Sequence, residues 1–404
     1  LDANTTGIDN VAVGYDALGA NTTGHRNTAV GRNALILSNA NDNTAVGRRA
    51  MGSNTGGGSN TAVGRDALYF NSSGNHNVAI GNSALYQNTT GSDNIAIGLE
   101  AGNSNQTNTG NVSIGKFAMY ANTAANNTGV GYWALKANTT GSNNVAVGYT
   151  ALLANTTAAF NTAVGYESLK ANTTGERNSA FGRTALFTNT TGNYNTASGM
   201  SALWGNTTGA SNTSVGYNSL FANTTASNNT AVGANSLTAT TTGASNAAVG
   251  TSAMQVNTTG ADNTAVGMQA LYNNTTASYN TAVGKGALYA NTTGANNTAL
   301  GQAIASNTTG SNNTGVGWDC LASNSTADNN TAVGRQTMLS NTTGTSNTAI
   351  GKSALYSNTT ANSNTAVGFT ALVANTTGAR NVAVGYSALD ANTTAGNNVA
   401  VGYD

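Results

Sequence analysis

The side chains that most often do chemistry are few and widely spaced in this 404-residue chain. It has one cysteine, Cys320, and two histidines, His25 and His76, while its fourteen acidic residues occur scattered along the sequence. A metal site needs several such ligands that converge, and a catalytic site needs an irregular set of groups in a pocket. We therefore expect no enzyme activity, no metal site and no cofactor.

Charge and hydropathy exclude two further classes of protein. Only 7% of the residues are charged, and fourteen Lys and Arg balance fourteen Asp and Glu. A nucleic-acid-binding protein needs clustered basic residues, and a membrane-spanning helix needs an apolar run of about 18 residues. Neither pattern is present, so we expect no nucleic-acid partner and no membrane insertion in this segment.

The dominant feature is an internal repeat of the motif Asn-Thr-Ala-Val-Gly, which occurs in 24 copies. The glycines that close successive motifs are 17 residues apart, or 16 in three cases. A constant short period is the signature of a stacked repeat architecture. We therefore predict that residues 1–404 form a single continuous repeat array, part of a longer fibre.

The period selects the fold class. Helical repeats need about 33 to 47 residues and avoid frequent glycine, whereas this chain has 50 glycines and a 17-residue repeat. We predict an all-β protein, a parallel β-solenoid (β-roll) of about 24 coils. Thr-Ala-Val is expected to be one short strand, Ala-Leu-x-Ala a second strand or extended piece, and Asn-Thr-Thr-Gly a turn.

Two invariant positions of the motif are predicted to form ladders along the stack. Identical positions in neighbouring coils lie about 4.8 Å apart, so stacked amides can hydrogen-bond from one coil to the next. An invariant glycine indicates a backbone conformation, or a close approach of backbones, that other residues do not allow. The predicted ladder residues include Asn10, Asn27, Asn77, Asn144, Gly14, Gly31, Gly81 and Gly148.

The alternation within Thr-Ala-Val separates two faces of the strand. The central position is almost always Ala, which indicates a very thin interior. The flanking positions are almost always Thr or aliphatic and never charged, so we expect them to be covered by another copy of the chain. The predicted oligomer face includes Val13, Val30, Ile80, Ile97 and Val147.

Two other sets of residues are candidate surface sites. Asn-Thr-Thr matches the N-glycosylation acceptor pattern, but a turn in which the asparagine caps itself is favoured, because glycans on every coil would crowd at a spacing of about 4.8 Å. Aromatic residues in variable positions could bind sugars or protein, or could only stack on one another. The candidate acceptors are Asn4, Asn21, Asn172, Asn257 and Asn341. The candidate ligand residues are Tyr69, Tyr86, Tyr132, Trp204 and Trp318.

The motif resembles a known family of repeats. The segments 77–81 (Asn-Val-Ala-Ile-Gly), 94–98 (Asn-Ile-Ala-Ile-Gly) and 144–148 (Asn-Val-Ala-Val-Gly) are similar to the core of the YadA-like head repeats (Hep_Hag type) of trimeric autotransporter adhesins, and of related bacterial and phage surface fibres. The resemblance implies a left-handed β-roll in which three chains pack their aliphatic strands around a common axis. It covers five residues of each repeat, because the period of 17 and the Ala-Leu-x-Ala-Asn-Thr-Thr-Gly half differ from the family's coil.

Together these features predict an extracellular structural or adhesive fibre at a cell surface. Its coils would form a rigid shaft or head that presents variable rows for attachment to a cell or surface. The expected partners are copies of the chain itself, as a homotrimer or filament, together with a host surface or glycans. Two alternatives are an ice-binding β-solenoid and a glycan-coated scaffold filament.

Overall fold

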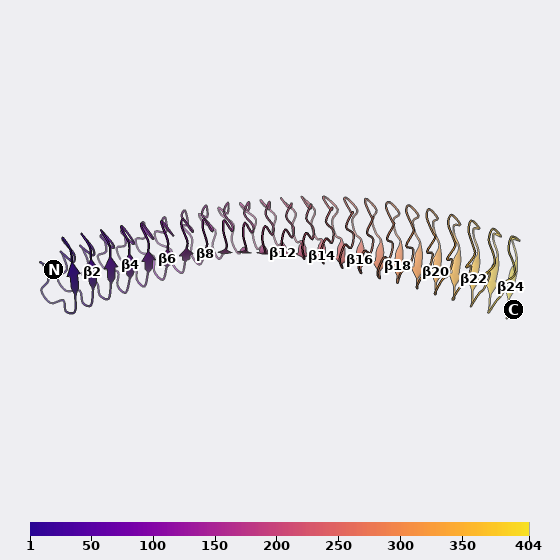
Figure 1. Ribbon diagram of the computed structural model, residues 1–404, viewed down its shortest axis with the longest axis horizontal. Coiled ribbons are helices and arrows are strands. Elements are labelled where there is room, and N and C mark those ends of the chain that lie inside the picture. The colour runs from indigo at the N-terminus through magenta and orange to yellow at the C-terminus, as the bar shows by residue number, and fades with distance from the viewer. Residues whose placement is uncertain (404) are drawn as a thin grey trace. The chain divides into compact units, whose positions relative to one another are not determined.

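The computed structural model describes residues 1–403 and divides the chain into two compact units. The first contains Leu1–Ser201 and Asn206–Thr208, and the second contains Ala202–Gly205 and the chain from Gly209 onward. Each unit is a parallel β-solenoid in which one coil of about 17 residues contributes one strand (Figure 1). The described residues contain no helix, as the sequence predicts.

Every coil has a single three-residue strand that covers the Thr-Ala-Val part of the motif. In the first unit the strands are β1 (Val11–Val13), β2 (Thr28–Val30), β3 (Thr44–Val46), β4 (Thr61–Val63), β5 (Val78–Ile80), β6 (Ile95–Ile97), β7 (Val112–Ile114), β8 (Thr128–Val130), β9 (Val145–Val147), β10 (Thr162–Val164), β11 (Ser179–Phe181) and β12 (Thr196–Ser198). In the second unit they are β13 (Thr213–Val215), β14 (Thr230–Val232), β15 (Ala247–Val249), β16 (Thr264–Val266), β17 (Thr281–Val283), β18 (Thr298–Leu300), β19 (Thr314–Val316), β20 (Thr331–Val333), β21 (Thr348–Ile350), β22 (Thr365–Val367), β23 (Val382–Val384) and β24 (Val399–Val401).

Within each unit, consecutive strands pair in parallel and in strict register. Ala79 on β5 lies opposite Ala96 on β6, and Ala265 on β16 lies opposite Ala282 on β17. The pairing continues across the 16-residue coils, because Thr298 on β18 still pairs with Thr314 on β19. A missing residue is therefore absorbed in a turn, and like positions remain stacked.

The Ala-Leu-x-Ala segment is a series of turns, and the prediction of a second strand there was wrong. Its leucine adopts a left-handed backbone conformation, with φ near 51° at Leu68 for example. A left-handed residue other than glycine costs about 1–2 kcal/mol. Here it directs the leucine side chain into the coil, where Leu68 is fully buried, and its N–H donates to Ala84 O in the next coil at 2.9 Å.

The interior is as thin as the sequence predicts. It contains the strand alanines, the Ala-Leu pairs and two rows of asparagine, and Ala62, Ala67 and Leu68 have no exposed surface. Local substitutions compensate for one another in this space. Gly129 takes the place of a strand alanine, where a Cβ would lie 2.7 Å from Met119 Cγ. Close packing of this kind makes the interior sensitive to a single methyl group.

The motif glycine ends each strand because two constraints meet there. At Gly98 φ is +133°, which side chains disfavour, and an added Cβ would lie 2.6 Å from the carbonyl oxygen of Gly115 in the next coil. The same close approach of successive motif glycines recurs along both units. Only hydrogen fits between these backbones, which explains why the position does not vary.

Candidate interaction surfaces

The asparagine that opens each motif, here called the motif asparagine, forms a ladder between coils. Asn144 donates its backbone N–H to Asn127 Oδ1 at 2.9 Å, and its own Oδ1 accepts the N–H of Asn161 at 2.9 Å. Its Nδ2 donates to the carbonyl oxygen of Ala158 at 2.9 Å. The ladder therefore runs mainly from side-chain oxygen to main-chain N–H.

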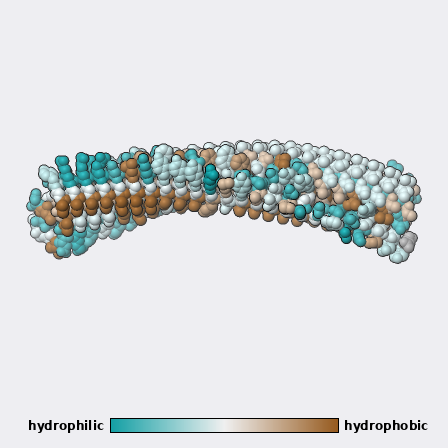
Figure 2. All heavy atoms as spheres, in the orientation of Figure 1, coloured by the Kyte–Doolittle hydropathy of each residue, from teal (hydrophilic) through white to brown (hydrophobic). Residues whose placement is uncertain are grey.

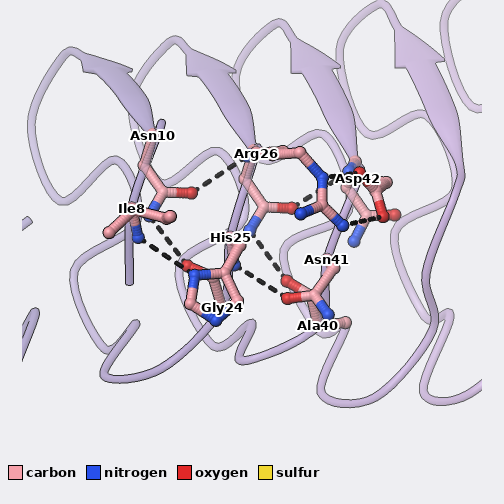
Figure 3. A network of polar contacts seen from close by, with 10 residues as sticks. Ile8, Asn10, Gly24, His25, Arg26, Ala40, Asn41 and Asp42 are labelled. Carbon is pink, nitrogen blue, oxygen red and sulfur yellow. Dashed lines mark hydrogen bonds and ion pairs between the residues drawn. The ribbon is translucent and has the colours of Figure 1, made fainter. Parts of the chain in front are cut away.

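Figure 3 shows the first rungs of this ladder beside a surface ion pair. Asn10 Nδ2 donates to Gly24 O at 2.7 Å, and Asn10 Oδ1 accepts from the Asn27 N–H at 2.9 Å. Beside these rungs, Arg26 donates through Nε and Nη2 to the two carboxylate oxygens of Asp42, and this hydrogen-bonded pairing lowers the pKa of the Asp42 carboxyl. Both charged side chains are exposed, so the pair belongs to the outer surface.

Direct amide-to-amide stacking occurs instead in the asparagine that opens Asn-Thr-Thr-Gly, here called the turn asparagine. Asn172 Nδ2 donates to Asn155 Oδ1 at 2.9 Å and to its own turn at Gly175 O, also at 2.9 Å, while Asn172 Oδ1 accepts from Asn189 at 2.8 Å. Ser38 and Thr240 replace the turn asparagine in two coils, and each accepts the next amide through its hydroxyl oxygen.

This geometry leaves no room for a glycan on most of the candidate acceptors. Asn21, Asn172, Asn257 and Asn341 have no exposed surface. The Nδ2 atom that would carry the sugar already donates both of its hydrogens inside the coil, as at Asn172. Asn4 alone among the five is exposed. The other four asparagines are therefore interior residues, and their burial favours the self-capping turn over a glycan.

The first threonine of Asn-Thr-Thr is also used within the fold. Thr173 Oγ1 donates to Thr190 O of the next coil at 3.0 Å, and Thr275 Oγ1 donates to Thr292 O at 3.1 Å. The second threonine faces solvent, as Thr174 does. The two threonines of a turn therefore do not present one shared array of hydroxyls to water.

The outer face of the strands, here called the sheet face, combines the Val or Ile position that precedes each motif glycine with the Thr or Val position two residues earlier. Their side chains point away from the interior alanines, and Val13 is 56% exposed, Ile80 37% and Ile350 43%. Val30, Ile97 and Val147 are half-buried. Figure 2 shows the apolar residues as a brown stripe over the strands of the first unit. No charged residue occurs at either position of the 24 strands.

Several aromatic residues lie in ladders in which neighbouring rings cover one another. Tyr132, Tyr149 and Tyr166 follow the motif glycines of three successive coils, in what we call the post-glycine row. Their ring centroids are 5.5 and 5.2 Å apart, with planes 7° and 11° from parallel. Such pairs contribute about 0.5–1.5 kcal/mol each beyond area burial.

The other candidate ligand residues are arranged in the same way. Tyr69 stacks on Tyr86 at 5.7 Å, and Trp204 stacks on Phe221 at 5.2 Å. Trp318 is covered by the guanidinium of Arg335, 4.9 Å from the ring centroid. A sugar that stacks on one of these covered ring faces would have to displace the neighbouring ring or cation. The ladders therefore present mainly ring edges and hydroxyls to solvent.

The single thiol is an interior residue. Cys320 takes the place of the alanine that precedes the interior leucine and has no exposed surface. Its Sγ donates to Ala332 O at 3.1 Å, as Ser168 Oγ does to Ala180 O at 3.0 Å. Burial raises the pKa of the thiol to about 12, so it is neutral and unreactive at physiological pH.

Residues 1–403 contain no cluster of three or more His, Cys, Asp or Glu side chains that could hold a metal ion. Nor is any helix in this range long and apolar enough to cross a membrane. No protein-family model matches the chain, and no curated protein is significantly similar to it. The physical properties of the surface therefore carry the functional argument.

Proposed function

We propose that this protein is an extracellular structural or adhesive fibre, at a cell surface, whose sheet face associates with copies of itself. The observation that carries the proposal is the uncovered apolar row along the strands of both units. Val215, Val249 and Ile350 are 37%, 40% and 43% exposed, yet no charged residue occurs at this position of any strand. Extended exposed apolar patches on soluble proteins mark interaction sites.

The uniformity of the sheet face favours a copy of the chain as its occupant. A second copy of the chain has the same spacing between coils, so it could place an aliphatic residue against each aliphatic residue of the sheet face. Isologous or cyclic association of identical chains is the commonest way to bury such a face. Three chains around one axis would match the resemblance to trimeric adhesin heads, and the post-glycine row would then carry the contacts with a target surface.

The native mass of the full chain in solution tests this proposal. We expect three times the 40.1 kDa of one chain. The double variant Val266→Lys/Val283→Lys should lower that mass while the circular dichroism spectrum is retained. Both positions are 38% exposed in the single chain, so the chain can fold with lysine there, but the assembly would bury the two lysine charges.

Met268→Lys is the matched control. Met268 lies in the same coil as Val266 and is 43% exposed, but it belongs to the post-glycine row, where Lys285 and Lys352 occur naturally. We expect this variant to keep the assembly intact. A monomeric wild-type chain, or an assembly that tolerates the two lysines on the sheet face, would refute the proposal.

A further inference from the structure

Three arginines stand one above another in the first unit, and we call them the arginine row. Arg32, Arg48 and Arg65 each follow a motif glycine in successive coils, and all three side chains are exposed. Backbone hydrogen bonds establish their register, since the N–H of Arg49 donates to Arg32 O at 2.9 Å and that of Asp66 donates to Arg48 O at 3.0 Å. The backbone positions from which successive arginine side chains extend are therefore about 4.8 Å apart.

The fold supplies little compensating charge for this row. The carboxylate that is paired beside this row, Asp66, is buried and binds Arg49 Nε at 2.7 Å, and Arg65 Nε approaches it at only 3.4 Å. Arg32 lies 5.7 Å from the Tyr15 ring centroid. Arg48 has no ion pair or ring contact with any described residue. Like charges on adjacent strands repel one another.

Elsewhere in the post-glycine row, cations sit on aromatic rings. Arg183 covers Tyr166 at 5.9 Å, Arg335 covers Trp318 at 4.9 Å, and Lys352 covers Phe369 at 5.4 Å. Arg32 covers Tyr15 in the same way, but Arg48 and Arg65 have no such ring, and the arginine row places three cations in consecutive coils of a chain whose net charge is zero. An anion for each coil would relieve their repulsion.

We propose that the arginine row binds a linear acidic polysaccharide along the fibre, with carboxylate or sulfate groups on successive sugars contacting successive guanidinium groups. Arginine is suited to this because its planar fork binds an oxyanion through two parallel hydrogen bonds. The inference does not depend on self-association, because all three arginines belong to the same chain.

The surroundings favour a polysaccharide over a single-stranded nucleic acid. Proteins that hold single strands stack bases on open aromatic faces. Near the arginine row, both faces of Tyr69 are occupied, by Arg49 at 5.1 Å and by Tyr86 at 5.7 Å. Apart from Tyr15, which is 70% exposed at one end of the row, the row thus offers charge and hydrogen-bond donors at a regular spacing without an aromatic platform for bases.

The test measures binding of the full chain to polygalacturonate, which carries carboxylates, and to heparin, which carries sulfates, by calorimetry at several salt concentrations. Neutral dextran and an oligodeoxythymidylate serve as comparison ligands. The test variant is Arg32→Gln/Arg48→Gln/Arg65→Gln. The chain should tolerate it, because Asn82 and Gln302 occupy the same row in other coils.

A second triple variant, Arg183→Gln/Arg335→Gln/Lys352→Gln, removes the same net charge from the same row. We expect the arginine-row variant to bind at least one acidic polysaccharide tenfold or more weakly, with a salt dependence reduced by about two to three ions, because each neutralised anion releases about one counterion. The second variant should change affinity less than twofold.

Three results would overturn the inference: no binding to either acidic polymer, equal losses in the two triple variants, or oligodeoxythymidylate bound as tightly as the polysaccharides. Which of the two acidic polymers binds more tightly identifies the anionic group. Native mass measured on the same samples keeps this test apart from that of self-association, because the arginine-row variant should assemble like the wild type.

Discussion

Replacing Gly216 by alanine tests whether the close approach of backbones is what requires glycine in every motif. Gly216 has φ +130°, and an added Cβ would lie 2.7 Å from both the carbonyl carbon and the carbonyl oxygen of Gly233 in the next coil. The strained backbone costs about 1–3 kcal/mol, and overpacking against atoms that cannot rotate away costs about 1–3 kcal/mol more. We therefore expect a local destabilisation of about 2–6 kcal/mol.

Gly286→Ala is the matched control in the same unit. Its φ is +65°, but no atom lies within 4 Å of the added Cβ. Gln269 and Ser252 occupy the same position of neighbouring coils at φ 58° and 57°. The cost of the left-handed backbone, about 1 kcal/mol, is partly offset by the reduced entropy of the unfolded chain. We expect a change of no more than about 1 kcal/mol.

Hydrogen exchange followed by mass spectrometry is the suitable assay, because a stack of repeats can open locally. The reporter is the Gly233 N–H, which donates to Val215 O at 2.8 Å across the substituted coil. In Gly216→Ala, peptides around this amide should lose protection, whereas in Gly286→Ala they should not. Wild-type protection in Gly216→Ala, or equal losses in both variants, would refute the argument from close approach.

Two further predictions concern the interior. Asn291→Leu should lower the free energy of unfolding in urea by about 3 kcal/mol or more, since Asn274 Oδ1 loses its donor, one hydrogen of Asn307 Nδ2 loses its acceptor, and Gly294 O loses one of its two donors. Asn291→Thr should cost only about 1 kcal/mol, because Thr240 already fills this position in another coil, where its hydroxyl donates to Asn257 O and accepts from Asn257 Nδ2. For Cys320, the folded pKa of about 12 lies above the unfolded value, so its contribution to stability is complete below pH 9 and lost between pH 9 and 12. Relative to Cys320→Ala, the wild type should lose up to about 4 kcal/mol over that range, and parallel pH profiles would contradict this.

The repeat in the sequence determined a large part of the fold. An uninterrupted period of about 17 specifies which residues become neighbours, because parallel stacking places each residue beside its equivalent one coil later. The same pattern separates the small alanine, which must be interior, from the uncharged Val and Thr positions that face outward. The period and the alternation within the strand together predict four features of the structure. These are the parallel solenoid, the Thr-Ala-Val strand, the buried position of Cys320 and the stacked motif asparagine.

The course of the chain within one coil was decided only by the tertiary structure. Local propensity does not predict that Leu68 adopts a left-handed backbone, because that conformation is unfavourable by itself and is compensated by burial and by bonds to the next coil. The path of the chain around the coil also directs the Asn172 side chain inward, where its glycosylation acceptor pattern is inaccessible. The same path places Tyr149 between the rings of Tyr132 and Tyr166. A one-dimensional period identifies which residues stack, but the direction of each side chain depends on how all 17 positions close the coil together.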